Sequence, residues 1–258
     1  MALDRWVPYR NETAIVRCRL FCFAHAAGNA AFYRPLRRLI PPEIDFCPVE
    51  MPGRAARLAE APFMSMTALM EGLRHVLQPL MSVPFAFFGH SIGAWVAHEA
   101  ARQLRASDGR SAVHLFVSGR ASPERGYTAP FSRKLRSDED LLAILDRFGG
   151  TPPAILQYPG FMAALLPVLR ADLALVDGYT IGSQDRINCP ITAFGGADDA
   201  FCSGIQSWRH LTQGKFRSRQ FPGGHFYFSP AADALAGEII QDLNSVLFVH
   251  AAGGGSRL

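Results

Sequence analysis

The chain lacks several features that would place it in other classes of protein. Its five cysteines form no C-x-x-C pair and are odd in number, which argues against a disulfide framework or a zinc site. No apolar run approaches the roughly 18 residues of a membrane-spanning helix, and the N-terminus has no apolar segment typical of a signal peptide. We therefore expect a cytoplasmic protein with reduced thiols, no bound metal and no membrane contact.

Nucleotide-binding and nucleic-acid-binding signatures are also missing, since the chain has no Walker sequence and no G-x-G-x-x-G. Lysine is nearly absent: the chain, of net charge +4, has 24 arginines and only two lysines, Lys134 and Lys215. A genome rich in G and C accounts for such a bias, while the alternative is that some arginines meet an acidic, phosphorylated partner. No nucleic-acid partner is expected.

The rest of the composition is that of one folded domain. Hydrophobic residues make up 49% and charged residues 19% of the 258 residues, so we expect most of the chain to be folded. We expect a single α/β domain over residues 1–258, with a flexible tail at 251–258.

Strand-like and helix-like segments alternate along the chain, which predicts a mostly parallel sheet flanked by helices. The predicted strands are 15–23, 44–51, 85–88, 113–118, 191–194 and 216–220. The predicted helices of the main body are 29–40 (with a break at Pro35), 66–80, 94–104, 205–211 and 231–247. Between about 120 and 185 there are helical segments at 138–148 and 161–179, the second interrupted at Pro167, but no strand. This region predicts an inserted helical lid.

One strand ends in a sequence that can present a reactive serine. The apolar run 85–88 leads into G-H-S-I-G, where Ser91 stands between Gly89 and Gly93 and a helical segment follows. Strand, tight turn and helix are the context of a nucleophile elbow, and the glycines allow the turn to pack closely. The alternative is an ordinary turn serine.

A histidine and two aspartates follow Ser91 in the order found in α/β-hydrolases. The sequence F-P-G-G-H-F sets His225 in a glycine-rich loop, and the strand 191–194 ends in G-G-A-D-D, which contains Asp198 and Asp199. A serine hydroxyl needs a base to become nucleophilic, and the base needs an orienting carboxylate. These residues alone leave open which aspartate serves, and whether His225 is merely a loop histidine.

Several further segments resemble the type II thioesterases, the stand-alone editing enzymes of polyketide and nonribosomal-peptide synthesis. The resemblance covers about 19–246 and includes FCFAHAAG at 21–28, MPGR at 51–54, GHSIGA at 89–94, FGGTPP at 148–153, LRAD at 169–172 and FPGGHF at 221–226. The two lid segments, at 148–153 and 169–172, distinguish this family from general esterases. Ala24, Ala27 and Ile92 depart from the family, which usually has Pro, Gly and Met there.

The resemblance implies an α/β-hydrolase fold and an assignment for each site residue. Ser91 would be the nucleophile, His225 the base and Asp199, the second acid of its motif, the orienting carboxylate. The backbone N–H after the nucleophile, that of Ile92, is one expected donor to the oxyanion. The family motif places the second donor at Ala26.

The expected activity is hydrolysis of acyl thioesters on the phosphopantetheine arm of an acyl or peptidyl carrier protein, by a monomer without a cofactor. A general acyl-CoA thioesterase or carboxylesterase is the alternative, and a non-catalytic acyl-binding protein is a weaker one. The basic segment 133–136 could meet an acidic carrier protein or could simply be solvated. His25 is expected to fix its loop rather than to act as a second base.

Overall fold

The computed structural model describes residues 2–10, 15–123, 137–150, 153–177, 179, 181 and 185–253. Its centre is a six-stranded sheet in the order β2-β1-β3-β4-β5-β6, and each neighbouring pair of strands is parallel. The strands are β1 Cys18–Phe23, β2 Ile44–Pro48, β3 Phe85–His90, β4 His114–Ser118, β5 Ile191–Gly196 and β6 Phe216–Phe221. All six strands were predicted, with ends that shift by a few residues.

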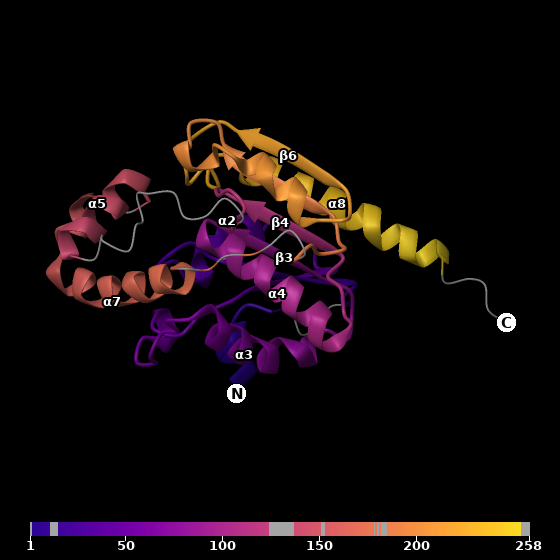
Figure 1. Ribbon diagram of the computed structural model, residues 1–258, viewed down its shortest axis with the longest axis horizontal. Helices are drawn as coiled ribbons and strands as arrows, with labels where there is room; N and C mark the ends of the chain where they lie inside the picture. The colour runs from indigo at the N-terminus through magenta and orange to yellow at the C-terminus, as the bar shows by residue number, and fades with distance from the viewer. Residues whose placement is uncertain are drawn as a thin grey trace.

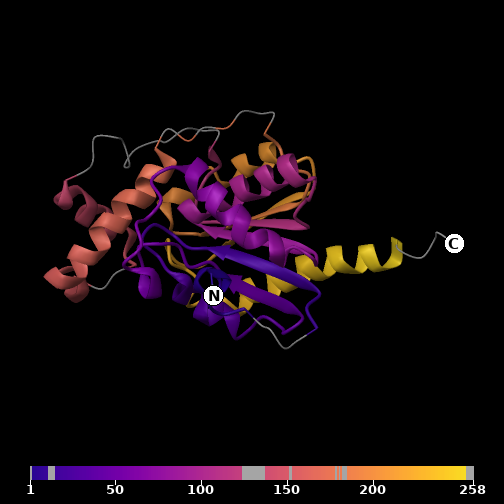
Figure 2. The ribbon, with the colours of Figure 1, turned by 90° about the horizontal axis from the view of Figure 1, so that it is seen from below.

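Helices cover both faces of this sheet, as Figures 1 and 2 show. The helices are α1 Ala2–Trp6, α2 Arg34–Arg37, α3 Met66–Leu77, α4 Ile92–Asp108, α5 Asp138–Phe148, α6 Pro153–Leu156, α7 Pro159–Val176 and α8 Ala232–Gly253. Side chains of α3 and α4 pack on Phe21, Phe87 and Val117, whereas α2 and α8 pack on the opposite face with Leu20 and Phe88. Because successive strand residues point to opposite faces, an apolar run such as that of β3 fills both layers of core.

Several helix predictions need correction. The segment predicted as a helix at 29–40 is divided into a 3-10 turn, Ala30–Tyr33, and the short α2, and the segment predicted at 205–211 is a 3-10 helix. Pro167 does not interrupt its helix, since α7 runs through it with buried residues on both sides. The short helices α1 and α6 were not predicted.

The ends of the chain were also only partly predicted. Helix α8 extends to Gly253, beyond the expected end at 247, and residues 254–258 of the expected tail lie outside the described residues.

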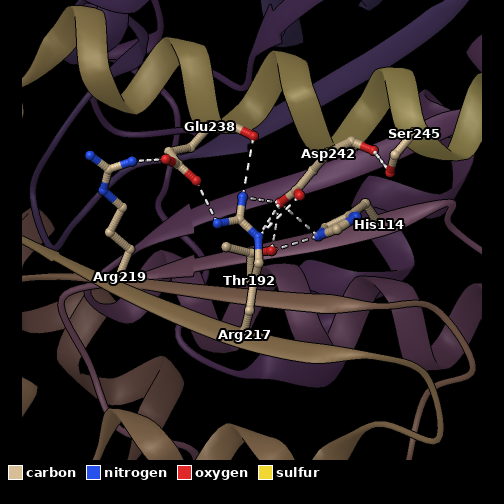
Figure 3. Close-up of polar contacts among 7 residues, drawn as sticks. All are labelled: His114, Thr192, Arg217, Arg219, Glu238, Asp242 and Ser245. Atoms are coloured by element: carbon tan, nitrogen blue, oxygen red, sulfur yellow. Dashed lines mark hydrogen bonds and ion pairs between the residues drawn. The ribbon is translucent and has the colours of Figure 1, made fainter.

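The last helix is attached to the sheet by a polar cluster as well as by its apolar face (Figure 3). Arg217 of β6 donates to Asp242 of α8 over 2.7 Å and also pairs with Glu238. The Thr192 hydroxyl donates to Asp242 over 2.6 Å, so it accepts from the Nε2–H of His114, which lies 2.9 Å away. Three strands and one helix are therefore joined by one network of hydrogen bonds, and those to the carboxylates of Asp242 and Glu238 are charge-assisted.

Helices α5, α6 and α7 follow β4 and precede β5, and Figure 1 shows α5 and α7 beyond one end of the sheet. This is the region predicted as a lid. By length and composition α7 could span a membrane, contrary to the expectation that no segment could. It contains the buried Asp172 and packs on α4 and α5, so we describe it as a helix of the folded domain.

Candidate active site

The turn after β3 holds Ser91 in a strained conformation. Its φ of 56° and ψ of −122° are unusual for a residue with a side chain, and Ile92 begins α4 immediately afterwards. A Cβ on Gly89 would lie 2.0 Å from the Gly93 carbonyl oxygen, and a Cβ on Gly93 would lie 2.2 Å from that of Phe23. Both glycines are therefore required by backbone contact, and the Ser91 N–H is fixed by a 2.7 Å bond to the Ser118 carbonyl.

Asp199 is the aspartate that lies against His225. The Nδ1 atom of His225 is 2.7 Å from Asp199 Oδ2, and both side chains are buried. Asp198 is exposed, and its N–H donates to the Gly223 carbonyl over 3.0 Å. The residues alone left open which of the two aspartates contacts His225. In the structure it is Asp199, because the loop after β5 turns the second carboxylate inward.

The environment of Asp199 keeps its carboxyl ionised at neutral pH. Burial raises the pKa of Asp199, but the hydrogen bond and charge of His225, the Phe201 N–H and the Cys202 thiol together lower it by more. The pKa therefore lies below its ordinary value. A carboxylate held in this way can fix the tautomer of the imidazole beside it.

The loop after β1, residues 25–28, lies beside Ser91 and carries one of the two expected oxyanion donors. Ala26 and Ile92 both line the same cavity as Ser91. Ala27 has a φ of 58°, a conformation that suits the glycine usual at this position in the family. We call residues 25–28 the oxyanion loop.

Two histidines that were not expected to act in chemistry lie close to His225. The His90 ring is 4.9 Å from that of His225, and its Nδ1 is 2.9 Å from the Ser118 hydroxyl, which in turn contacts Tyr227. The His25 ring lies edge-on between Phe32 and Phe226 and lines the cavity. Burial lowers the pKa of His25 to about 3, so this ring is neutral at physiological pH.

A cavity of about 210 Å³ opens over Ser91 and His225. Its other walls come from the oxyanion loop and from apolar residues of the lid helices, namely Ile144, Leu145, Phe148, Phe161, Leu165, Leu169 and Leu173. The Phe148 ring lies 4.6 Å from the His225 ring and 4.6 Å from that of Phe201. The lid residues that line the cavity, which the sequence could not single out, are thereby identified.

Arg54 and Asp172 are buried charged residues for which sequence reasoning gave no role. Each belongs to a segment that resembles the family, MPGR at 51–54 and LRAD at 169–172, so the signal was present in the motifs. The Arg54 guanidinium and the Asp172 carboxylate form a bidentate ion pair, with Nη2 2.7 Å from Oδ1 and Nη1 2.8 Å from Oδ2. The pair joins α7 to the turn after β2.

Other predictions about the site concern metals and the basic segment. Within the residues that the structure describes, no group of His, Cys, Asp and Glu could hold a metal ion, and the five cysteines are free and buried. The basic segment 133–136 lies outside the described residues.

Comparison with known proteins gives consistent matches. A family model described as a thioesterase domain matches residues 18–243. The gramicidin S biosynthesis protein GrsT of Aneurinibacillus migulanus is 36% identical over 250 residues, which cover 95% of this chain and 96% of that protein.

Two solved structures resemble the whole domain. The type II thioesterase BorB from the borrelidin biosynthetic cluster superimposes with a TM-score of 0.82 at 35% identity, over 93% of this chain and 98% of that one. RedJ, a thioesterase of the prodiginine pathway in Streptomyces coelicolor, superimposes with a TM-score of 0.80 at 33% identity, over 88% and 86% of the two chains.

Proposed function

The chain belongs to the thioesterase family, as a type II thioesterase with the α/β-hydrolase fold, and on that premise we propose how it works. It hydrolyses acyl thioesters on the phosphopantetheine arm of an acyl or peptidyl carrier protein, and so removes unwanted acyl groups from a polyketide or nonribosomal-peptide assembly line. The observation that carries the proposal is one cavity, roofed by the lid, that is lined by both Ser91 and His225, with Asp199 behind the imidazole.

The proposed reaction uses Ser91, His225 and Asp199 as a triad. The Ser91 hydroxyl attacks the thioester carbonyl while His225 Nε2 takes its proton, and Asp199 stabilises the imidazolium through Nδ1–H. The imidazolium then gives that proton to the departing thiolate, which leaves an acyl-enzyme. His225 next takes a proton from a water molecule as that water attacks the ester, and the imidazolium returns the proton to Ser91 Oγ as the acyl–oxygen bond breaks, which releases the acid and restores the free serine.

The developing negative charge on the carbonyl oxygen is met by the N–H groups of Ile92 and Ala26. Ile92 is the first residue of α4, so its N–H has no carbonyl partner within the helix and the helix dipole adds to its effect. Loss of one such donor typically costs about 3 kcal/mol in the barrier.

The apolar lid residues, Phe161 and Leu165 among them, support an acyl chain as the group that is bound. An aliphatic tail gains free energy in proportion to the apolar area that it buries, without requiring directional contacts. The carrier protein would remain outside and thread its arm past the lid. We further propose that the enzyme acts as a monomer in the cytoplasm.

A direct test is the replacement Ser91→Ala with a labelling experiment. We expect this variant to fold and to lose thioesterase turnover, and we expect a fluorophosphonate to label the wild type at Ser91 only. Labelling at another serine, or turnover that survives the replacement, would contradict the serine mechanism.

Carrier-protein substrates distinguish this proposal from a general acyl-CoA thioesterase or carboxylesterase. The same acyl group should give a higher kcat/KM on a carrier protein than on CoA, and the advantage should shrink as salt screens the protein–protein contact. Equal kcat/KM on the two substrates at all salt concentrations would favour the alternative.

A further inference from the structure

A buried ion pair connects the lid to the oxyanion loop. Arg54 is 6% exposed and Asp172 is 1% exposed, and the two side chains bind through two parallel hydrogen bonds. Arg54 lies in the turn after β2 and Asp172 in the C-terminal part of α7. A pair like this gains little net stability over apolar residues of the same size, so stability alone does not account for it.

Both members of the pair also bind the backbone of the oxyanion loop. The Asp172 Oδ2 atom accepts the N–H of Ala27 over 2.7 Å, and Arg54 Nη1 donates to the carbonyl of Gly28 over 2.9 Å. The loop closes on itself through a 2.9 Å bond from the Gly28 N–H to the His25 carbonyl. Ala26 and Ala27 are therefore the two central residues of a four-residue turn.

This turn is in a conformation that its sequence does not favour. Ala27 has a positive φ at the third position of the turn, where glycine is preferred, and such a conformation typically costs about 1–3 kcal/mol for other residues. Without its contacts to Asp172 and Arg54, the turn could relieve this strain by rotation about the backbone bonds of Ala26 and Ala27, which would displace the Ala26 N–H from Ser91.

We propose that Asp172 and Arg54 are positioning residues of the thioesterase reaction, which hold the oxyanion loop in its active form through Ala27 and Gly28. This inference depends on the proposed function, because it takes the Ala26 N–H as an oxyanion donor. Asp172 lies on α7, so the oxyanion hole is complete only while this helix is seated. Ala26 and Ala27 also pack against the apolar cluster of the lid, which includes Leu169 and Ile144.

Two double variants separate this positioning role from simple stability. Arg54→Met with Asp172→Leu removes both the charges and the acceptor for the Ala27 N–H. Arg54→Met with Asp172→Asn removes the charges but keeps an amide oxygen that can accept the same hydrogen. Neither leaves an unpaired buried charge, so both are expected to fold, with melting temperatures that report any loss of stability.

We expect the variant with Asp172→Leu to lose about 100-fold in kcat with KM nearly unchanged, as expected for a misplaced transition-state contact. The variant with Asp172→Asn should stay within several-fold of wild type. Adding Ala27→Gly to the first variant should restore much of kcat, because glycine adopts the positive φ without support.

A second measurement reports the oxyanion hole without turnover. An alkyl boronic acid forms a tetrahedral adduct with the serine hydroxyl, so its affinity should fall in parallel with kcat across these variants. Affinity for a thioether analogue of the substrate, which has no carbonyl, should not change.

Several outcomes would overturn the proposal while leaving the enzyme class intact. These are equal losses of kcat for the two double variants, a kcat unchanged by Asp172→Leu, or no rescue by Ala27→Gly. If the variant with Asp172→Leu does not fold, Arg54→Met with Asp172→Ala is the second test, since alanine also removes the acceptor for the Ala27 N–H but adds no bulk. An unchanged kcat there would also overturn the proposal, whereas a wild type inactive on every thioester would contradict the proposed function instead.

Discussion

The floor and the roof of the active site are built in opposite ways. The floor consists of Ser91, Asp199 and His225, which stand at the carboxyl ends of β3, β5 and β6 and are held by short hydrogen bonds and a strained turn. The roof consists of α5 and α7, which present mainly leucine, isoleucine and phenylalanine to the cavity. We infer that the floor determines whether a thioester is cleaved and the roof determines which acyl group is accepted.

The roof itself is attached unevenly. Helix α7 is fixed to the main body by the buried pair of Asp172 with Arg54, while α5 packs on α7 and meets His225 through Phe148. The division between floor and roof is therefore not complete, because α7 reaches the oxyanion loop. Changes in the floor should lower the rate by orders of magnitude, and most changes in the roof by much less.

The largest effect is expected for Asp199→Asn. An amide cannot hold His225 in the tautomer that accepts the serine proton, and the comparable change in a protease triad costs about 10⁴-fold in kcat. Asp198→Asn is the matched control and should change kcat little, because Asp198 is exposed and the carboxylate bound to His225 is that of Asp199. The reverse ranking in steady-state kinetics would contradict the assignment of Asp199.

A second large effect should appear in stability at low pH, and it belongs to the main body of the domain rather than to the roof. Burial lowers the pKa of His25 to about 3, and those of His98 and His114 to about 4. No histidine lies between residues 115 and 209. The lid helices therefore contribute no histidine to this effect.

The sign of the effect follows from proton binding. The unfolded chain takes up these protons near pH 6.5 and the folded chain only at lower pH, so the free energy of unfolding falls as pH drops from 6.5 toward 4. Each such histidine contributes about 1.4 kcal/mol per pH unit across that window.

Denaturant unfolding measured between pH 7 and pH 5 tests this expectation. His98→Leu should flatten the pH dependence by about one proton, because both ring nitrogens of His98 are buried and have no hydrogen-bond partner among the described residues. Replacement of the exposed His75 on α3 is the control and should leave the slope unchanged. A slope that His98→Leu does not alter would show that the buried ring is not responsible.

The smallest effect is expected where the roof touches the floor, at Phe148. Its ring packs on His225 and Phe201, and an aromatic pair contributes about 0.5–1.5 kcal/mol. Phe148→Ala should therefore lower kcat/KM by up to about tenfold. Phe148→Leu should keep most of the activity.

The control for Phe148 is Leu142→Ala in the same helix. Leu142 is a partly buried member of the lid cluster but does not line the cavity, so its loss should affect stability more than kcat/KM. If Leu142→Ala slows the reaction as much as Phe148→Ala does, the contact with His225 has no special role.

Local features of the fold could be predicted from sequence, and the elbow is the clearest case. The contact between Gly89 and Gly93 is made within five residues, so a short motif contains the whole requirement. The strands were predictable for the same reason, because each is a short apolar run. The expected break at Pro167 was wrong because packing on both sides of α7 outweighs the single backbone bond that proline removes.

Features that join distant parts of the chain could not be predicted from the residues. Arg54 and Asp172 are 118 residues apart, and no periodicity or spacing indicates that they meet. The choice between Asp198 and Asp199 depends on how the loop after β5 turns, which the residues alone left open and the resemblance to the family decided. The position of Phe148 over His225 likewise requires the lid to be folded onto the sheet.

The attachment of α8 has a consequence for how the protein is made. Residues such as Leu235, Ile239 and Leu243 of α8 cover the face of the sheet that contains Phe88 and Phe116. These two phenylalanines belong to β3 and β4, which are synthesised well before α8. Until residues 232–253 have been synthesised, that face is covered only in part, by residues such as Tyr33, Leu36 and Phe228. A chain that lacks residues 232–253 therefore exposes an aromatic surface, and exposed apolar surface of this kind favours aggregation of incomplete chains.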